Sequence, residues 1–535
     1  MIRKIVKISV IMMVIGVLSS CNSNIAIESI PSNDLEDKEI VTEVIEMEEM
    51  SMSIRPVTSL NPLLEYDVDV VEKLNLVYDK LFYFDENMKW ASDIVADYTL
   101  DMTTRQLVIG LKEDVYFGNG ELMTAVDVAN SIGILINADE NVYYKDKVRN
   151  ISSYNVRNMD GIQKIVLTFA SNTPLYEIDL SFPIVSSKTY EGTSYSMPYG
   201  SGNYLLDVND KYLEFSFTDN PYDDGTPNIK KINFTVIDNE VTEIYSFENG
   251  IINSALTSPN EWLKYKKNYE SQVFAYDRNE LEFIGFNYNN VLLQDINMRQ
   301  AISRAISYED ILEDVYVNYG ELTNTGVNPN SWLYNDDIEP ITKSVSTAKK
   351  LLDDNGYILN SVTNTRIKTI DGKTYNANFN ILVNSDNEER VHLANILQSS
   401  LESIGIQTNI VSLGYEEYIL ALNNKEFDLF IGGMVVDSSQ LFMKVFTGNN
   451  PFSYGSESLN TLIEEISVVT TNDEFESKHR EIQSLLSSAT TFIPLLYKYD
   501  VFIVDGEVDN AKVFYDNLFY NVDEWAYSKE HIYEK

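Results

Sequence analysis

Cysteine and histidine are scarce in this sequence. Its 535 residues include one cysteine, Cys21, and three histidines. A single thiol excludes an internal disulfide framework and a metal site built from several cysteines. His392, His479 and His531 lack the short spacing of metal ligands, so we interpret each as an exposed residue of a helix or tail. Stability must therefore come from hydrophobic cores, and this length allows roughly two or three domains.

The sequence also lacks the short motifs that mark many enzymes. It contains no Gly-x-Ser-x-Gly elbow, no P-loop, no Gly-x-Gly-x-x-Gly fingerprint and no His-Glu-x-x-His helix. Carboxylates are so abundant that a pair resembling a glycosidase site carries no weight. We therefore predict a protein that is not an enzyme and that holds no metal or other cofactor.

Basic residues are few relative to acidic ones. Lys and Arg number 40 against 82 Asp and Glu, which gives a net charge of -42. Proteins that bind nucleic acids present a basic surface to the phosphates, so this balance excludes DNA and RNA as partners. Aromatic residues nevertheless make up 12% of the chain, including 35 tyrosines, which is typical of a folded protein and not of a disordered acidic polymer.

The N-terminus has the pattern of a secretory signal peptide. A basic segment, residues 1–7, precedes an apolar run over residues 8–18 and two serines. The run is too short to span a bilayer, and no later segment reaches the roughly 20 apolar residues of a spanning helix. We therefore predict a secretory signal peptide and not a membrane-spanning helix. The alternative is an ordinary hydrophobic helix that buries the free thiol of Cys21.

Leu18-Ser-Ser-Cys21 resembles the lipobox of bacterial lipoproteins. The resemblance implies removal of residues 1–20 and lipidation of Cys21, with the mature chain anchored to the cell membrane at its extracytoplasmic face. Residues 21–49 are dominated by Glu, Asp, Ser and Asn, and we interpret them as an acidic tether. Order is expected to begin near residue 48, where apolar and polar residues alternate as in a half-buried strand.

Strands and helices are interleaved along the body of the chain. The expected elements include strands at 106–112 and 164–169 and helices at 124–135 and 347–355. Asp295 is placed to cap a further helix whose apolar residues share one face, and Gly356 is placed to end the helix before it.

The clearest architecture lies between Asn376 and Val436. Alternating strands and helices are predicted at 379–383, 389–404, 406–412, 415–422 and 427–431. This order favours a parallel or mixed sheet covered by helices. Ligands of such sheets bind beyond the carboxyl ends of the strands, and Asp437 lies just past one such end.

A series of motifs follows in order along the chain. The most specific is Leu111-Lys-Glu-Asp-Val-Tyr-Phe-Gly-Asn-Gly120 with Thr124-Ala125 and Asp127-Val128 behind it. The others are Ser59-Leu-Asn-Pro62, Leu76-Val-Tyr-Asp-Lys-Leu81, Tyr199-Gly-Ser-Gly-Asn-Tyr204, Phe286-Asn287, Arg299-Gln-Ala-Ile302, Ala348-Lys-Lys-Leu-Leu352 and Gly356-Tyr357. Together they resemble the extracellular solute-binding proteins of family 5, the oligopeptide and dipeptide receptors of ABC importers. The resemblance extends from about Met50 to Trp525.

The resemblance implies an α/β fold of two lobes that close like a clamshell, of the periplasmic-binding-protein type called cluster C or type II. One lobe would carry an extra subdomain. The implied boundaries are residues 50–84, 190–279 and 498–535 for lobe I, 85–189 for its insert subdomain and 280–497 for lobe II. Ligand would lie between the lobes, and hinge closure would present a shape that the permease recognises.

The resemblance also implies a role for Asp437. Peptide-binding members keep an aspartate at this place to receive the peptide's α-ammonium, and a carboxylate in a closed cleft can pair with that group. The alternative is a loop-capping or solvated aspartate. Gly432, Gly433, Met434 and Val435 could pair with an extended peptide backbone. Met434 is either a flexible contact for varied side chains or an ordinary core residue.

Further pocket candidates come from approximate alignment with the family. They are Tyr66, Val68 and Tyr143, for each of which ordinary packing is the alternative. Two departures from the family limit the ligand assignment. Met434 stands where a tryptophan is frequent, and Ile431 stands where some members carry a basic residue able to meet a peptide carboxylate.

These features predict a monomeric, lipid-anchored receptor that captures short peptides and delivers them to an ABC permease. The same fold could instead bind an oligosaccharide, a metal chelate or a signalling peptide, since a fold does not name its ligand. A surface hydrolase or an adhesion module is the alternative of a different class.

Overall fold

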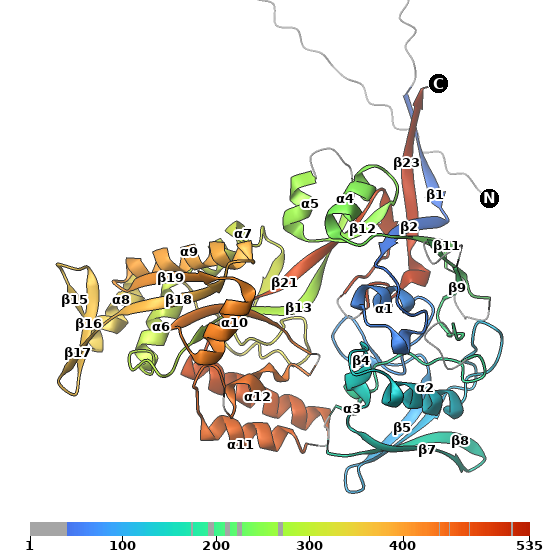
Figure 1. Ribbon diagram of the computed structural model, residues 1–535, viewed down its shortest axis with the longest axis horizontal. Coiled ribbons are helices and arrows are strands. Elements are labelled where there is room, and N and C mark those ends of the chain that lie inside the picture. The colour runs from blue at the N-terminus through green and yellow to red at the C-terminus, as the bar shows by residue number, and fades with distance from the viewer. Residues whose placement is uncertain are drawn as a thin grey trace, which may run out of the picture.

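The computed structural model describes residues 40–172, 175–190, 197–208, 214–221, 227–265, 271–437, 439–448, 450–469, 471–514 and 517–534. These residues form two lobes, side by side in Figure 1, which are joined by the long antiparallel strands β13 (Gln272–Phe286) and β21 (Ile493–Val504). Each lobe combines sheets with helices around its own hydrophobic core. The two-lobed α/β fold expected from the sequence is confirmed.

Lobe I, on the right of Figure 1, is built on a mixed four-stranded sheet. In spatial order its strands are β2 (Glu49–Ile54), β11 (Lys231–Val236), β10 (Glu214–Asp219) and β9 (Tyr204–Val208). β2 runs parallel to β11 and buries its apolar side chains, as the alternation predicts. The remaining elements of this lobe are α1 (Val68–Leu74), α4 (Glu240–Glu248), β12 (Ser254–Thr257), α5 (Pro259–Tyr265) and the short 3-10 helices η1 (Pro62–Leu64) and η6 (Val522–Glu524).

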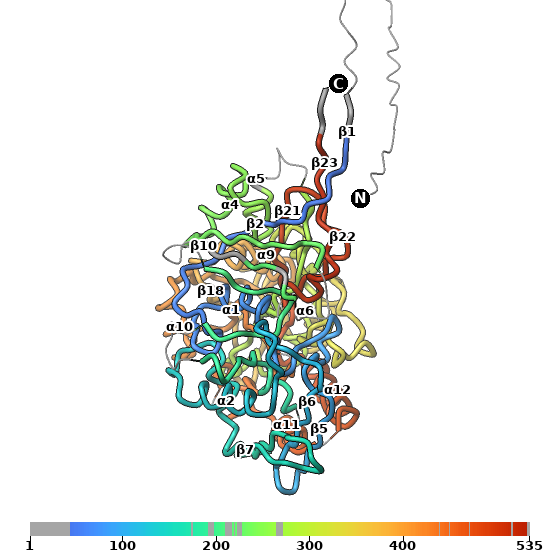
Figure 2. Tube along the Cα trace, turned by 90° about the vertical axis from the view of Figure 1, so that its right-hand side faces the viewer, coloured from blue at the N-terminus to red at the C-terminus, as the bar shows by residue number. Residues whose placement is uncertain are grey.

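The two ends of the described chain form an antiparallel ribbon that projects from lobe I, as Figure 2 also shows. β1 (Ile40–Met47) pairs with β23 (Ala526–Glu534) along its whole length, and β22 (Glu507–Asp509) adds a third strand at the base. Regular structure therefore begins before residue 48, because β1 gains a partner from the far end of the chain. The acidic segment 21–49 thus includes β1, and its part before residue 40 lies outside the described residues.

Residues 85–189, which are expected to form an insert subdomain, contain a sheet of their own. This antiparallel sheet consists of β5 (Val95–Asp101), β6 (Gln106–Leu111), β8 (Ile162–Phe169) and β7 (Ile151–Met159). α2 (Ala125–Asn137) packs on this sheet and begins with a capping box, in which Thr124 and Asp127 satisfy each other's backbone N–H groups. The other elements here are β4 (Trp90–Ala91), η2 (Lys145–Val148) and α3 (Tyr176–Asp179); β3 (Tyr83–Phe84), just before residue 85, pairs with β4.

Lobe II is organised by a large mixed sheet in the order β12-β21-β13-β20-β18-β19. Its own strands are β20 (Leu429–Val435), β18 (Asn378–Asn384), β19 (Gln407–Leu413) and β14 (Gly320–Leu322), the last beside β21. Its helices are α6 (Ile296–Ala305), α7 (Tyr308–Asp314), α8 (Val345–Asp354), α9 (Glu388–Ser403), α10 (Tyr415–Asn424), η5 (Leu441–Phe446), α11 (Glu457–Ile466) and α12 (Asn472–Ala489). A small sheet of β15 (Ile358–Asn360), β16 (Thr365–Ile370) and β17 (Lys373–Asn376) lies at the far end of the lobe.

The strand-helix alternation predicted for residues 376–436 is confirmed as β18-α9-β19-α10-β20. β18 is parallel to both β19 and β20, as this order requires. Asp295 caps α6 by accepting a hydrogen bond from the Asn297 N–H, again as expected.

We call β13 and β21, the two strands that both lobes share, the hinge strands. Phe274 and Phe502 pack in the core of lobe I, whereas Ile284 and Ile493 pack in that of lobe II. The pairing of the two strands changes register between Asp277 and Leu281. Such an irregularity bends and twists a strand, which allows the sheet to pass from one lobe to the other. The lobe boundaries expected at 279/280 and 497/498 fall within this stretch.

Candidate ligand-binding site between the lobes

β20 has one paired edge and one open edge. It pairs with β13 from Leu429 to Val435, but with β18 only at Leu429 and Phe430. Beyond Phe430, no strand in the described part of the chain pairs with its second edge. Backbone donors and acceptors are therefore available there to an extended ligand.

Backbone alternation determines which residues present their polar groups to this open edge. The Val436 N–H donates to the Asn279 carbonyl at 2.8 Å, and Asn279 Nδ2 donates to the Val436 carbonyl, so the backbone groups of Val436 face β13. Residues one position away along the strand present their backbone N–H and C=O groups to the opposite edge. Gly433 and Val435 consequently present their N–H and C=O groups to the open edge. The Ile431 carbonyl, on the same edge, accepts a hydrogen bond from the Tyr418 hydroxyl at 2.9 Å.

The side chains along this edge are not equivalent. Val435 is 61% exposed, whereas Met434 is half-buried and packs against the phenylalanine-rich cluster of lobe II. Gly433 stands beside the Arg390–Glu282 ion pair, and a Cβ atom there would lie 2.1 Å from Arg390 Nη2. Glycine therefore lets the ion pair approach the strand. Met434 thus packs against the core of lobe II, and its expected role as a contact for ligand side chains stays a prediction.

Asp437 follows β20 and is exposed. Its Oδ1 accepts hydrogen bonds from the Ser439 N–H at 2.8 Å and from the Ser439 hydroxyl, which forms the turn expected of a loop-capping aspartate. Oδ2 has no hydrogen-bond partner among the described residues. The carboxylate can thus hold the turn with one oxygen and receive a ligand with the other.

A buried polar network supports the loop after Asp437. Gln440 is fully buried, and its side chain accepts hydrogen bonds from the Asn328 N–H at 2.9 Å and the Tyr497 hydroxyl at 3.1 Å. His479 Nε2 donates to the Gln440 carbonyl at 3.1 Å, and Gln483 donates to His479 Nδ1 at 3.0 Å. The expectation that His479 is exposed is wrong, because this network encloses it. Burial lowers the pKa of His479 to about 4, so the ring is neutral.

Lobe I contributes a second group of predicted residues. The Tyr143 N–H donates to the Glu65 carbonyl at 2.9 Å, which places Tyr143 beside the segment that carries Tyr66 and Val68. The exposed fractions of Tyr66, Val68 and Tyr143 are 48%, 43% and 40%. Their surfaces are thus accessible to a ligand.

Glu65, which sequence reasoning missed, fixes the shape of this loop. It is fully buried, and its carboxylate accepts from the backbone N–H groups of Thr58, Ser59, Tyr66 and Asp67 at 2.6 to 3.1 Å. The only signal of this role in the sequence is that Glu65 is an acidic residue three positions after the Ser59-Leu-Asn-Pro62 motif. One carboxylate thereby holds the start of the Ser59-Leu-Asn-Pro62 motif against the turn that carries Tyr66.

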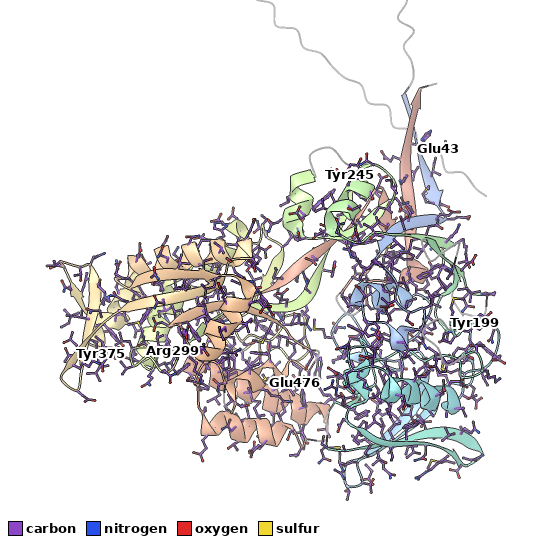
Figure 3. The ribbon with its side chains drawn as sticks, viewed as in Figure 1. Glu43, Tyr199, Tyr245, Arg299, Tyr375 and Glu476 are labelled. Atoms are coloured by element: carbon purple, nitrogen blue, oxygen red, sulfur yellow. The ribbon has the colours of Figure 1, made fainter. Side chains whose placement is uncertain are left out.

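The two lobes touch beside Asp437. Leu175 and Ile178, from the α3 segment, join a hydrophobic cluster that is otherwise made by lobe II and the tryptophan of β4. That residue, Trp90, meets Trp332 edge to face at a centroid distance of 5.9 Å. Figure 3 shows Glu476, on α12, on the side of lobe II that faces the insert subdomain.

The charge of Asp437 acts across the contact between the two lobes. Burial raises the pKa of the Asp179 carboxyl, in α3 of the insert subdomain, to about 6. Lys147 and Asn150 oppose this rise, and the negative charge of Asp437 adds to it. The carboxylate of Asp437 in lobe II is therefore near enough to the Asp179 carboxyl of lobe I for their charges to interact, and a cation bound beside them would relieve the repulsion.

Glu177 is a second buried carboxyl in α3. It is 3% exposed; the Tyr98 hydroxyl donates to Oε1 at 3.3 Å, and no described residue hydrogen-bonds to Oε2. Burial raises its pKa to about 7. The charged form is therefore destabilising in the folded protein.

We expect Glu177→Gln to remove a pH dependence of stability. The folded-state pKa of about 7 exceeds the unfolded value of 4.5, so the contribution of Glu177 is fully favourable below the unfolded pKa and is lost as the pH rises through 7. The loss amounts to about 3 kcal/mol of unfolding free energy. Between about pH 4.5 and pH 8, urea unfolding should show a fall in stability that is smaller in the variant than in the wild type by this amount, since Asp179 and Glu282 keep their own raised pKa values. Glu113→Gln, at an exposed site, should behave like the wild type; an unchanged slope in Glu177→Gln would contradict the assignment.

Comparison with known proteins agrees with this geometry. The family described as bacterial extracellular solute-binding proteins, family 5 (middle region), matches residues 90–453. The oligopeptide-binding protein AppA of Bacillus subtilis is 21% identical over 514 residues, which cover 89% of this chain and 91% of that protein.

Solved structures show the same fold. A nickel ABC transporter protein from Bacillus halodurans has a TM-score of 0.78 at 18% identity, covering 90% of this chain and 100% of that one. AppA from Bacillus subtilis in complex with a nonapeptide has a TM-score of 0.60 at 18% identity, covering 91% of this chain and 100% of the other.

Proposed function

Because the chain belongs to the bacterial extracellular solute-binding proteins of family 5, we propose that it is the lipid-anchored receptor of an ABC importer and that it captures short peptides. The observation that carries the peptide assignment is the open edge of β20, which ends at an exposed aspartate. The edge offers backbone hydrogen bonds from Gly433 and Val435, and Asp437 offers a carboxylate for an α-ammonium group. Such contacts use features common to all peptides, so binding tolerates many side-chain sequences.

The basic side chains near β20 are already occupied. Arg390 is bound to Glu282 and Glu280, Lys498 to Glu389, and Arg278 to Asp500. A peptide carboxylate therefore gains little from this part of the site. We propose that the N-terminal half of the peptide supplies most of the binding free energy.

Relatives with other ligands define the competing proposal. The nickel-binding periplasmic protein of Escherichia coli is 21% identical over 66% of this chain. Among the described residues, no group of three or more His, Cys, Asp or Glu side chains could hold a metal ion. A chelate that brings its own donors, an oligosaccharide and a signalling peptide are the alternative ligands.

The proposed location follows from the sequence of the N-terminus. Cys21, the proposed lipidation site, lies outside the described residues. In the part of the chain that the structure describes, each helix is too short or too polar to cross a membrane. An anchored, monomeric receptor would stay close to its permease and deliver ligand over a short distance.

The proposal is tested by calorimetry on protein from which bound ligand has been removed by unfolding and refolding. We expect saturable binding of short synthetic peptides with little dependence on sequence. Two sets of peptides should differ in affinity: one N-methylated at odd-numbered residues and one at even-numbered residues. Only one set should bind more weakly, because only alternate amides of an extended peptide can face Gly433 and Val435. Absence of heat and of a melting shift with every peptide pool would reject peptides, and binding of a nickel-histidine chelate or an oligosaccharide instead would establish the alternative.

A further inference from the structure

A cavity of about 210 Å³ lies where the hinge strands meet the start of the insert subdomain. Its wall includes Phe84 and Phe514 from lobe I, Asn330 from lobe II, and residues of β13 and β21. Of the residues described for the candidate peptide site, only Asn279, which holds Val436 through hydrogen bonds, lines it; none of the residues predicted to contact the peptide does. The cavity is therefore a separate feature of the hinge.

The lining of this cavity combines aromatic rings with a buried carboxylate. Tyr499 of β21 joins Phe84 and Phe514, and Asp277, which lies opposite Tyr499 in the strand pairing, provides the carboxylate. Aromatic rings attract cations through the negative charge on their faces, and the attraction is strongest where water is excluded. This combination is characteristic of sites for organic ammonium groups.

Asp277 has no cation of its own. It is 7% exposed and accepts hydrogen bonds from the Asn279 N–H at 2.6 Å and from the side-chain amides of Asn328 at 2.5 Å and Asn330 at 3.3 Å. All of these donors are neutral, and none of the described residues forms an ion pair with it. The neighbouring Arg278 is bound to Asp500 at 3.2 Å. Burial accordingly raises the pKa of Asp277.

We propose that the hinge cavity binds a small organic cation, whose alkylated ammonium group lies among the aromatic rings and pairs with Asp277. A buried carboxylate is costly unless it is paired, and a ligand cation supplies the missing charge. The two other carboxylates of the lining are already engaged, since Asp85 accepts hydrogen bonds within its own turn and Glu86 forms an ion pair with Lys512. Calcium and magnesium need several oxygen ligands, and among the described residues no group of three or more His, Cys, Asp or Glu side chains could hold a metal ion. The occupant is therefore an amine or a quaternary ammonium compound.

The position of the cavity couples it to lobe closure. Phe84 and Phe514 belong to lobe I and Asn330 to lobe II, so the cavity has this shape only in the present arrangement of the lobes. A cation bound here stabilises that arrangement. The bound cation therefore also strengthens the binding of any cleft ligand that favours the same arrangement of the lobes. Because such coupling is reciprocal, the cleft ligand strengthens the binding of the cation by the same factor.

The test uses choline as the cation and 3,3-dimethylbutan-1-ol as its uncharged analogue of equal shape, each titrated into the full protein by calorimetry. We expect saturable binding of choline, and binding of the neutral analogue that is weaker by about tenfold or more. Asp277→Asn should weaken choline binding by a similar factor. Ala275→Phe places a ring at the exposed part of the lining and should also block choline, without touching the hydrogen bonds of Asp277.

Controls separate this site from the peptide site. Asp437→Asn should bind choline as the wild type does, and choline binding should persist even if no peptide binds. Equal binding of the neutral analogue, no binding of choline, or loss of choline binding in Asp437→Asn would each overturn the proposal. Melting curves without ligand establish that each variant is folded, and Ala275→Phe decides the question if Asp277→Asn does not fold.

Discussion

Asp437→Asn is expected to weaken the binding of peptides with a free N-terminus by about 30-fold or more. Removing one partner of a charge pair in a water-poor cleft costs about 2 to 5 kcal/mol, and each 1.4 kcal/mol is about tenfold in affinity. Asparagine has the size of aspartate, and its carbonyl oxygen can still accept the hydrogen bond from the Ser439 N–H, so the turn after β20 should persist. Calorimetry with one tripeptide in free and N-acetylated form measures the effect.

The acetylated peptide is the internal control, because it carries no ammonium group for Asp437 to receive. Its affinity should be lower from the start and should change little in the variant. Asp160→Asn provides a matched change of charge at an exposed turn of the insert subdomain, where asparagine tolerates the observed φ of 57°. It should leave both affinities unchanged. Equal losses for the free and acetylated peptides in Asp437→Asn would reject the ammonium role and leave only the turn-forming role.

Arg390→Met is expected to lower the free energy of unfolding by about 3 to 5 kcal/mol, the usual cost of removing one partner from a buried ion pair. Arg390 Nε and Nη2 contact the Glu282 carboxylate at 2.9 and 2.6 Å, and Nη2 also contacts Glu280 at 3.1 Å. The Glu282 side chain is fully buried, and burial raises its pKa even with the arginine present. Without Arg390, this carboxylate must be protonated or remain unpaired. Urea unfolding at neutral pH measures the loss.

Arg149→Met is the matched control for this experiment. Arg149 forms ion pairs with Glu140 and Asp146, but its side chain is 60% exposed, so the same substitution should change stability by less than about 1 kcal/mol. The double variant Arg390→Met with Glu282→Met should recover much of the loss, since it leaves no unpaired charge at the buried position. A cost below about 1 kcal/mol for Arg390→Met alone would show that water reaches Glu282.

Local structure was largely predictable from the sequence, because its signals act over a few residues. The capping box of Thr124 and Asp127 starts α2 where the sequence indicated, and Gly356 adopts a φ of 79° just after α8. The β-α-β-α-β pattern predicted the parallel arrangement of β18, β19 and β20, since such connections permit few alternatives.

Contacts between distant segments account for what the sequence reasoning missed. Strand β1 was assigned to the tether because its partner, β23, lies almost the whole chain length away. His479 was expected to be exposed, yet it hydrogen-bonds to the carbonyl of Gln440 and is buried by residues from several elements. The roles of Glu65 and Glu177 likewise depend on donors and apolar neighbours that no local pattern reveals.

The sequence by itself determined the class of protein: too acidic for nucleic acids, without catalytic motifs, and with the landmarks of a solute receptor in order. It also identified Asp437 as the end of a strand in an α/β sheet. Only the tertiary structure decided that, among the described residues, no strand pairs with the second edge of β20 beyond Phe430 and no ion pair reaches Asp277 in its cavity. It also decided that the charge of Asp437 acts on a carboxyl of the other lobe. The physical reason is that motifs and periodicity reflect constraints between residues that are close in the sequence. Whether a strand edge or a charge finds a partner depends instead on which distant residues the fold brings next to it.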